Sequence, residues 1–287
     1  MVSELKTKKG DRGAFDENWK NRSETNYIHW TKGTPENQIQ LAFRNHWNLF
    51  NEIIEGRIKG RRVLEVGCGR GSMSAYFADD GFECTLLDSS ESAIETAKRI
   101  FEQNGLNAKY DVGDALKLPY DDHSFHLVFS IGLLEHFKDI YTPISEQIRI
   151  LDSGGIFLGY VVPKYTDNVQ KDYGWINDLL KAIVKQDSTD EDFEKTDVYR
   201  SDSGSDRYVD VLRKMPVKDI ACSGVYPLPM ISHSIEFPFT LLDKKCEAIL
   251  VQHFQGVLEA RFRNTGKNPW LCDEGFGQAF LIWCVKE

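Results

Sequence analysis

Residues 63–71, with the sequence VLEVGCGRG, constrain the fold of this chain more than any other stretch. Their apolar start predicts a buried strand, and the glycines Gly67, Gly69 and Gly71 predict a tight turn in which the backbone can approach a ligand closely. A helix that begins after such a turn points its free backbone N–H groups at a negative group of the ligand. This order predicts a parallel sheet that holds a nucleoside-bearing cofactor at the carboxyl ends of its strands.

The glycine spacing separates two kinds of cofactor loop. A dinucleotide-binding loop has the pattern G-x-G-x-x-G, and counted from Gly67 its last position is Ser72. An acidic residue, Glu65, lies in the strand just before the first glycine. A second predicted strand, residues 84–87, ends at Asp88, whose carboxylate can accept hydrogen bonds from both hydroxyls of a ribose. The loop therefore fails the dinucleotide pattern but is followed by an acid suited to a nucleoside.

Two further strand ends follow in the same order. Gly113-Asp114-Ala115 follows a third predicted strand near residues 108–112, and the sequence SIGLLEH at 130–136 follows a fourth. The alternation of strands and helices over residues 61–162 predicts a parallel, right-handed, doubly wound sheet. A tight turn alone would explain the glycines of the loop, but it would leave the acids at the next two strand ends unexplained.

This series of strand ends resembles the class I S-adenosylmethionine-dependent methyltransferases, especially their small-molecule branch. The matching stretches are VLEVGCGRG, TLLDSS and VGDALKLPYDDHSFHLVFSIGLLEHF, within residues 61–162, and a weaker resemblance continues to the C-terminus. It implies an α/β fold with a doubly wound, mostly parallel, seven-stranded Rossmann-like sheet whose last strand is antiparallel. It also implies a helical N-terminal extension and an insertion after the fifth strand.

The resemblance implies S-adenosyl-L-methionine as the cofactor. The residues that it places around the cofactor are Glu65, Gly67, Cys68, Gly69, Gly71, Asp88, Ser89, Asp114, Ala115, Ser130 and Ile131. The three glycines and Glu65 would serve the methionine part, Asp88 the ribose, and Ser89 and Asp114 the adenine. Ser130 and Ile131 would lie near the amino-acid end. Two alternatives stay open, since Asp88 could instead cap the following helix and Asp114 could be a turn residue.

Methyl transfer from a sulfonium is a displacement at carbon, so a protein mainly has to align the acceptor and exclude water. No metal is needed, and none is predicted. His136 after the fourth strand is the first candidate for a general base, because an imidazole can take a proton near neutral pH. His29 is the second candidate. A structural role for His136 stays open, and an amine or thiol acceptor would need positioning only.

The sequence divides into four parts: 1–60, an N-terminal tail and helical cover; 61–162, the cofactor-binding core; 163–206, an acidic insertion; and 207–287, the end of the sheet. The spacing of apolar residues predicts a helix from Pro35 to Ile54 that is capped by Thr34. Its aromatic stripe, Phe43, Trp47 and Phe50, is expected to pack on the core. Tyr27 and Trp30, which precede this helix, are expected to contact the substrate, because polar-tipped aromatics on a loop often line a ligand site.

Beyond the core the pattern is less regular. Ile144 to Leu151 predicts a helix that Gly154-Gly155 ends, and residues 156–162 predict the fifth strand. A helix near 175–184 leads into an acidic tract at 187–210, which is either a substrate lid or a solvated loop. A list of later elements completes the prediction: a short helix at 208–212, a strand at 221–226, an amphipathic helix at 241–262 and a closing strand at 276–285.

The composition of the chain restricts the kinds of partner that it is expected to bind. A net charge of -9 and a pI near 5.4 argue against a broad nucleic-acid surface, which needs a cationic field. No apolar run approaches the ~20 residues of a membrane span, and no signal peptide is recognisable, so a cytoplasmic protein is expected. The six cysteines form no C-x-x-C pair, which predicts reduced thiols rather than a zinc site. A monomer or a homodimer is expected.

These patterns predict a methyltransferase that acts on N, O or S of a small-molecule acceptor. One alternative is a transferase of the same fold that uses a modified adenosylmethionine, but such enzymes carry extra acids after the fourth strand, where this chain has only Glu135. A second alternative is a non-catalytic adenosylmethionine-binding protein, in which a damaged glycine loop or a lost Asp88 would be expected. Fold alone does not identify the acceptor.

Overall fold

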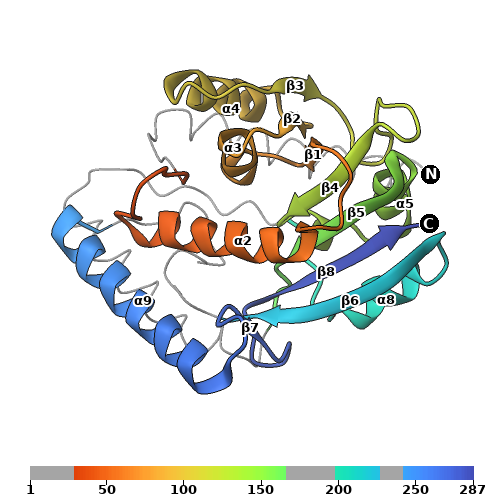
Figure 1. Ribbon diagram of the computed structural model, residues 1–287. Helices are drawn as coiled ribbons and strands as arrows, with labels where there is room; N and C mark the ends of the chain where they lie inside the picture. Colours follow the sequence, from red (N-terminus) through yellow and green to blue (C-terminus); the bar gives the residue numbers. More distant parts are fainter. Residues whose placement is uncertain (1–28, 166–197, 227–241) are drawn as a thin grey trace.

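The protein is described by a computed structural model that covers residues 29–165, 198–226 and 242–287. A single eight-stranded sheet runs through it in the order β3-β2-β1-β4-β5-β8-β6-β7 (Figure 1). The strands are β1 (Arg62–Val66), β2 (Glu83–Asp88), β3 (Lys109–Val112), β4 (Phe125–Ile131), β5 (Leu151–Val161), β6 (Val217–Val225), β7 (Leu271–Cys272) and β8 (Ala279–Lys286). Strands β1 to β5 pair in parallel, whereas β8 is antiparallel to β5 and β6. The doubly wound sheet is confirmed, but the expected number of seven strands is wrong.

The extra strand is β7, which is two residues long. Leu271 and Cys272 pair with Val225 and Gly224 at the outer edge of β6. So short a segment has no alternation of apolar and polar residues, which is why the sequence pattern did not predict it.

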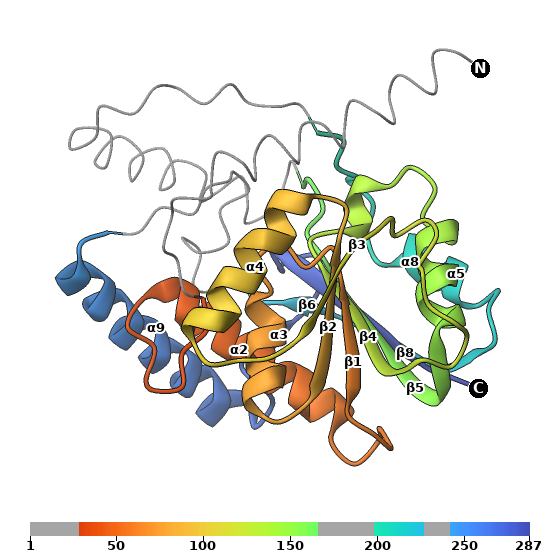
Figure 2. The same ribbon diagram turned by 90° about the horizontal axis from the view of Figure 1, so that it is seen from above.

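Helices cover both faces of the sheet. They are α2 (Gln38–Ile54), α3 (Ser72–Asp79), α4 (Glu91–Gln103), α5 (Tyr141–Arg149), α8 (Asp206–Leu212) and α9 (Lys244–Thr265), and a 3-10 turn, η1 (Leu134–His136), follows β4. Figure 2 shows α2, α3 and α4 on one side of the sheet, with α9 beside α2, and α5 and α8 on the other side. Each side has its own buried apolar cluster. Among the described residues, no helix has the length and apolarity that crossing a membrane requires.

Helix α2 begins at Gln38, three residues later than the sequence predicted. Asn37 is the N-cap, and its side chain accepts a hydrogen bond from the backbone N–H of Gln40 at 2.9 Å. The prediction that Thr34 caps the helix and Pro35 opens it is therefore wrong, because both residues precede the cap. The aromatic stripe packs as expected: Phe50 is fully buried, and Phe43 and Trp47 lie against the same apolar cluster.

The first turn of α2 is held by the C-terminal helix. Glu247 of α9 is buried, and its Oε2 accepts the backbone N–H of Gln38 at 2.9 Å while its Oε1 accepts the Gln38 side-chain amide at 3.0 Å. The Leu242 N–H also donates to Glu247 Oε1, at 2.9 Å. A carboxylate at a helix N-terminus satisfies donors that the helix itself leaves unpaired. This contact joins α2 to α9, which is more than 200 residues away in the sequence.

The fifth strand begins earlier than the sequence predicted. Leu151 is the first residue of β5, paired with Phe125, and not the end of the preceding helix, which stops at Arg149. Gly154 and Gly155 lie within this strand, at the irregularity where the register against β4 shifts. Gly154 has a positive φ of 80°, which a glycine tolerates, so these two glycines form a bulge rather than a helix end.

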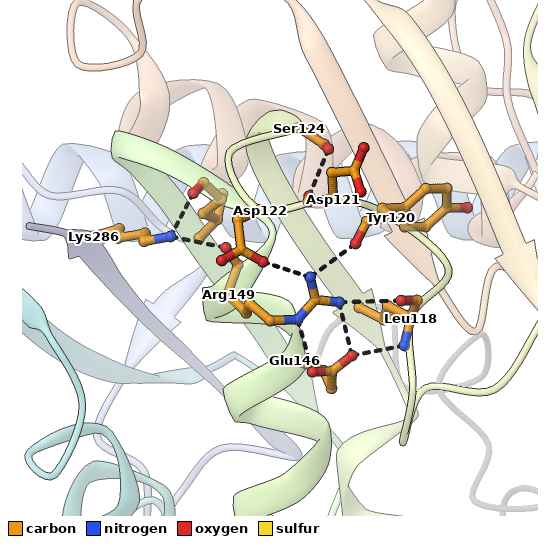
Figure 3. Close-up of polar contacts among 9 residues, drawn as sticks. Leu118, Tyr120, Asp121, Asp122, Ser124, Glu146, Arg149 and Lys286 are labelled. Carbon is orange, nitrogen blue, oxygen red and sulfur yellow. Dashed lines mark hydrogen bonds and ion pairs between the residues drawn. The ribbon is translucent and has the colours of Figure 1, made fainter.

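A polar network lies at the amino ends of β4 and β5, opposite the edge that carries the predicted site (Figure 3). Arg149 donates from Nε and Nη2 to the carboxylate of Glu146, from Nη1 to Asp122, and to the carbonyl oxygens of Leu118 and Tyr120. All five distances lie between 2.8 and 3.1 Å. An arginine has five N–H donors, so this guanidinium is fully satisfied.

Candidate functional site

The loop between β1 and α3 adopts a backbone conformation that requires glycine at three positions. Gly67, Gly69 and Gly71 have φ values of 70°, 51° and 67°, in the left-handed region. Close packing adds a second constraint, because a Cβ on Gly67 would lie 2.8 Å from Leu133, and one on Gly71 would lie 2.4 Å from Leu86. The loop is thus fixed on both sides, by the residue after β4 and by β2.

Asp88 ties the end of β2 to this loop. Its Oδ2 accepts the backbone N–H of Gly69 at 2.9 Å, and its Oδ1 accepts the N–H of Ser90 at 3.0 Å. The cap of α4 is Ser90 and not Asp88, because the Ser90 hydroxyl accepts the N–H of Ala93. Each carboxylate oxygen has two lone pairs, so Asp88 can accept further donors while it keeps these bonds. Ser89, the next residue, is exposed.

The end of β3 lies beside the end of β2. Gly113 donates its N–H to the Asp88 carbonyl at 2.9 Å, which places Asp114 and the buried Ala115 directly after this contact. Asp114 makes a turn of its own, since its Oδ1 accepts the Leu116 N–H at 3.0 Å. The turn role considered for Asp114 is therefore present. Its proposed contact with the adenine is a separate matter and stays a prediction.

Glu65 is buried in β1 and reaches the first turn of α3. Its Oε2 accepts both the backbone N–H and the hydroxyl of Ser74, at 3.1 and 2.6 Å. Burial raises its pKa to about 8, although these hydrogen bonds act in the opposite direction. Cys68 in the loop is buried too, and burial together with the nearby Asp88 raises the pKa of its thiol. Burial thus disfavours the charged form of both side chains.

The end of β4 brings the fourth predicted segment to the same edge. Ser130 pairs with Gly159 and is fully buried, and its hydroxyl has no hydrogen-bond partner. Ile131 is the last strand residue, and because neighbours in a strand point to opposite faces, its side chain lies on the other face from Ser130. Leu133 then touches the glycine loop. Residues from β1, β2, β3 and β4 thus meet at one edge of the sheet.

His136 lies in η1 and is held by a segment that comes after the fifth strand. Its Nδ1 lies 2.7 Å from the carbonyl oxygen of Tyr199, so this nitrogen carries the proton. Burial lowers the pKa of the ring to about 4, and the field of Arg200 acts in the same direction. The neutral ring, with its proton on Nδ1, keeps its lone pair on Nε2.

His29 belongs to the N-terminal cover and lies at the start of α3. Its Nδ1 is 2.6 Å from the Ser72 hydroxyl, and its ring stacks on Phe43 with centroids 4.8 Å apart. Trp30 is partly buried against the same apolar cluster. These contacts bring the cover next to the glycine loop, whereas His136 is positioned by a different segment. Tyr27 lies outside the described residues.

Two side chains at this edge, Glu135 and Arg200, were not among the predicted site residues. Glu135 is buried beside His136, and Arg200 precedes Ser201 in the segment that crosses η1. The sequence shows Arg200 only as one of the few cations in an acidic tract, and its proximity to Glu135 depends on tertiary structure. Among the described residues, no three His, Cys, Asp or Glu side chains gather as metal ligands would.

Known proteins match this chain over the same region. Residues 63–155 match a family model described as a methyltransferase domain. Ajmaline N-methyltransferase of Rauvolfia serpentina is 36% identical over 103 residues, which are 35% of this chain and 35% of that protein. Ubiquinone biosynthesis O-methyltransferase of Coxiella burnetii is 38% identical over 98 residues, 34% of this chain and 42% of that protein. The chain thus spans well under half the length of these relatives.

Solved structures match the fold over a larger part of this chain than the sequence relatives do. The structure of an S-adenosylmethionine-dependent methyltransferase from Thermotoga maritima aligns with a TM-score of 0.56 over 96% of this chain and 99% of that one, at 14% identity. At this identity the likeness concerns the fold, and it is a Rossmann-like methyltransferase fold. The matched region contains the glycine loop, Asp88, Asp114 and the end of β4. Over residues 63–155 this chain therefore matches the methyltransferase domain family, within a Rossmann-like methyltransferase fold.

Proposed function

We propose that this protein transfers the methyl group of S-adenosylmethionine to an N, O or S atom of a small-molecule acceptor. The observation that carries the proposal is the hydrogen bond from the Gly69 N–H to Asp88 Oδ2, at 2.9 Å. It joins the glycine loop to the acid that suits a ribose, so both parts of a nucleoside site are held in one place. The relatives named above, an N- and an O-methyltransferase, support the same reaction class.

The cofactor would be held by residues from four strand ends. The glycine loop would lie along its methionine part, Asp88 would accept from the ribose hydroxyls, and Asp114 and Ala115 would flank the adenine. The bound cofactor supplies an activated methyl group on a sulfonium sulfur. The chain's own task is to orient the acceptor and keep water out. His29 and Trp30 suit the second part of that task, because they cover the start of α3 beside the loop.

His136 is the proposed proton acceptor for a hydroxyl substrate. The Tyr199 carbonyl fixes its orientation through Nδ1, and its lowered pKa, about 4, keeps the ring neutral at neutral pH. The Nε2 lone pair can then take the proton that a hydroxyl loses on methylation. With an unprotonated amine acceptor, the same ring would contribute orientation alone. Exchange of His136 for Gln should therefore lower kcat for hydroxyl acceptors far more than for amines.

The test begins with calorimetry of the purified protein against S-adenosylmethionine and, separately, NADH. We expect the first to bind and NADH not to bind; binding of NADH alone would overturn the assignment of the loop. Asp88→Ala should weaken binding at least about tenfold, or about 1.4 kcal/mol, because the ribose hydroxyls lose their acceptor. Asp210→Ala, on the exposed face of α8, is the matched control.

Because Asp88 also accepts two backbone N–H groups, its loss could act through the loop alone. A 2′-deoxy analogue of S-adenosylhomocysteine separates the two effects. If Asp88 binds the ribose, removal of the hydroxyl should cost affinity in the wild type and almost none in Asp88→Ala. Equal losses in both proteins would show that Asp88 only shapes the loop. Binding without turnover on any amine, hydroxyl or thiol acceptor would favour the non-catalytic alternative.

A further inference from the structure

Several unpaired polar atoms lie where β4 and β5 end. Arg200 and Tyr208 both lie within the electrostatic reach of Glu135, and Ser130 is at the end of β4. These atoms are buried and have no hydrogen-bond partner: Glu135 Oε2, Arg200 Nη1, Ser130 Oγ and the hydroxyl of Tyr208. A buried polar group without a partner costs about 1–3 kcal/mol, and native structures have few of them. A group of four at the carboxyl edge of the sheet therefore calls for an occupant that can bond to them.

The segment that contains Arg200 is fastened to this edge on both sides. Before it, the Tyr199 carbonyl accepts from His136 Nδ1 at 2.7 Å. After it, the Ser201 N–H donates to the Glu135 carbonyl at 2.8 Å, and the Ser201 carbonyl accepts the Lys164 N–H at 2.8 Å. Arg200 lies between these contacts, so its guanidinium is held near both η1 and the end of β5.

Glu135 does not neutralise this guanidinium. Its Oε1 accepts the Val162 N–H at 3.3 Å, and within the described part of the chain no ion pair or hydrogen bond engages Arg200. Burial raises the pKa of Glu135 to about 7, so the carboxyl is only partly ionised near neutral pH. A partly buried guanidinium whose buried Nη1 has no partner, with at most a partial counter-charge, favours the entry of an anion.

We infer that Arg200 binds an anionic oxygen group, a carboxylate or a phosphate, of the methyl acceptor. The inference rests on the proposed function and names its substrate class. A guanidinium presents N–H groups in a planar fork that matches either anion, and the hydroxyls of Ser130 and Tyr208 are suited to donate to its remaining oxygens. The acceptor is the ligand concerned, because Glu135 and Arg200 lie beyond the end of β4, on the side of β5, whereas most of the expected cofactor residues follow β1, β2 and β3. Ser130, at the end of β4, is the one residue that both sites would share.

Ordered water is the competing explanation for the unpaired atoms. Water would satisfy Glu135 and the hydroxyls, and it would show no preference for anions. The two occupants therefore differ in their response to charge. An anion should be bound less well after loss of Arg200 and better after loss of the Glu135 charge, whereas a purely structural role predicts no such opposite pair.

The experiment uses the full chain saturated with S-adenosylhomocysteine. Sodium acetate and, separately, inorganic phosphate replace chloride at constant ionic strength, and the midpoint of thermal unfolding is recorded. We expect at least one anion to raise the midpoint by about 2 °C or more. Which of the two does so distinguishes a carboxylate from a phosphate acceptor. Arg200→Gln should abolish the shift, Glu135→Gln should enlarge it, and Arg213→Gln, a surface arginine on the loop after α8, should leave it unchanged.

Three results would overturn the inference: no shift with either anion, an equal shift in Arg200→Gln, or a tenfold loss of S-adenosylhomocysteine affinity in Arg200→Gln. The last would assign Arg200 to the carboxylate of the cofactor instead. Arg200→Lys keeps the charge without the fork and should retain part of the shift, which guards against a folding artefact. Binding of S-adenosylhomocysteine to the wild type is measured first, and its absence would count against the proposed function rather than against Arg200.

Discussion

Arg149 and Arg200 each lie beside a glutamate near an end of β4 and β5, yet their surroundings differ completely. Arg149 uses all five N–H donors on Glu146, Asp122 and two carbonyl oxygens (Figure 3). Arg200 has an unpaired, buried Nη1, and its neighbour Glu135 has an unpaired Oε2. A satisfied polar network stabilises a fold, whereas an unsatisfied one raises its energy until a ligand completes it. The comparison favours a structural role for the first region and is consistent with the anion site inferred for the second.

The largest expected effect concerns Arg149. Arg149→Met should lower the free energy of unfolding by about 3 kcal/mol, because Glu146 and two carbonyl oxygens lose their charged donor. Arg200→Gln should change it by less than about 0.5 kcal/mol, since no hydrogen bond is lost. Urea unfolding of both variants measures this, with Arg213→Met as a surface control. A similar cost at Arg149 and Arg200 would break the comparison.

The two glutamates should respond oppositely to pH. The folded pKa of Glu135, about 7, exceeds its ordinary value of 4.5, so its contribution to stability is present below pH 4.5 and lost as the pH rises through 7. Arg149 lowers the pKa of Glu146, so that contribution is present above 4.5 and lost in acid. Between pH 5 and 8, wild type should therefore lose roughly 2 kcal/mol relative to Glu135→Gln.

Unfolding free energies at pH 5 and pH 8 test this, with Glu146→Gln as the matched control. Both pH values lie above the ordinary pKa of Glu146, so the difference between wild type and Glu146→Gln should be nearly the same at the two. A Glu135→Gln protein that keeps the full wild-type pH dependence would show that Glu135 is ionised throughout. The partial charge invoked for the anion site would then be wrong.

The expected cofactor site and the site around Arg200 differ in how well the sequence predicted them. The glycine loop, Asp88 and the strand ends depend on residues close together in the chain, and apolar runs with glycine punctuation identify such elements. The approach of Arg200 to Glu135 depends on a segment 65 positions away, and no local pattern encodes it. The same reason explains the missed strand β7, which pairs with the distant strand β6.

The predicted ends of two elements, α2 and β5, were wrong for a related reason. Asn37 rather than Thr34 caps α2, although both residue types suit the position, because the competition is decided by where α2 meets Glu247 of α9. Gly154-Gly155 follows a helical pattern and suggested its end, but pairing with β4 extended the strand through both residues. At both places local propensity predicted the right type of element. Tertiary contacts then moved the ends of these elements by several residues.

Glu247 tests whether hydrogen bonding, rather than burial, distinguishes the region around Arg149 from the region around Arg200. It is as buried as Glu135, at 2% against 1% exposure, but three N–H groups from Gln38 and Leu242 satisfy its carboxylate. Glu247→Gln should cost about 1 kcal/mol, because one N–H loses its acceptor. The loss stays small because the unpaired Gln38 Oε1 can accept from the new amide. Urea unfolding at neutral pH measures it. A stabilising effect here would mean that buried acids in this fold are costly even when paired, and the unpaired atoms around Glu135 would no longer single out a ligand site.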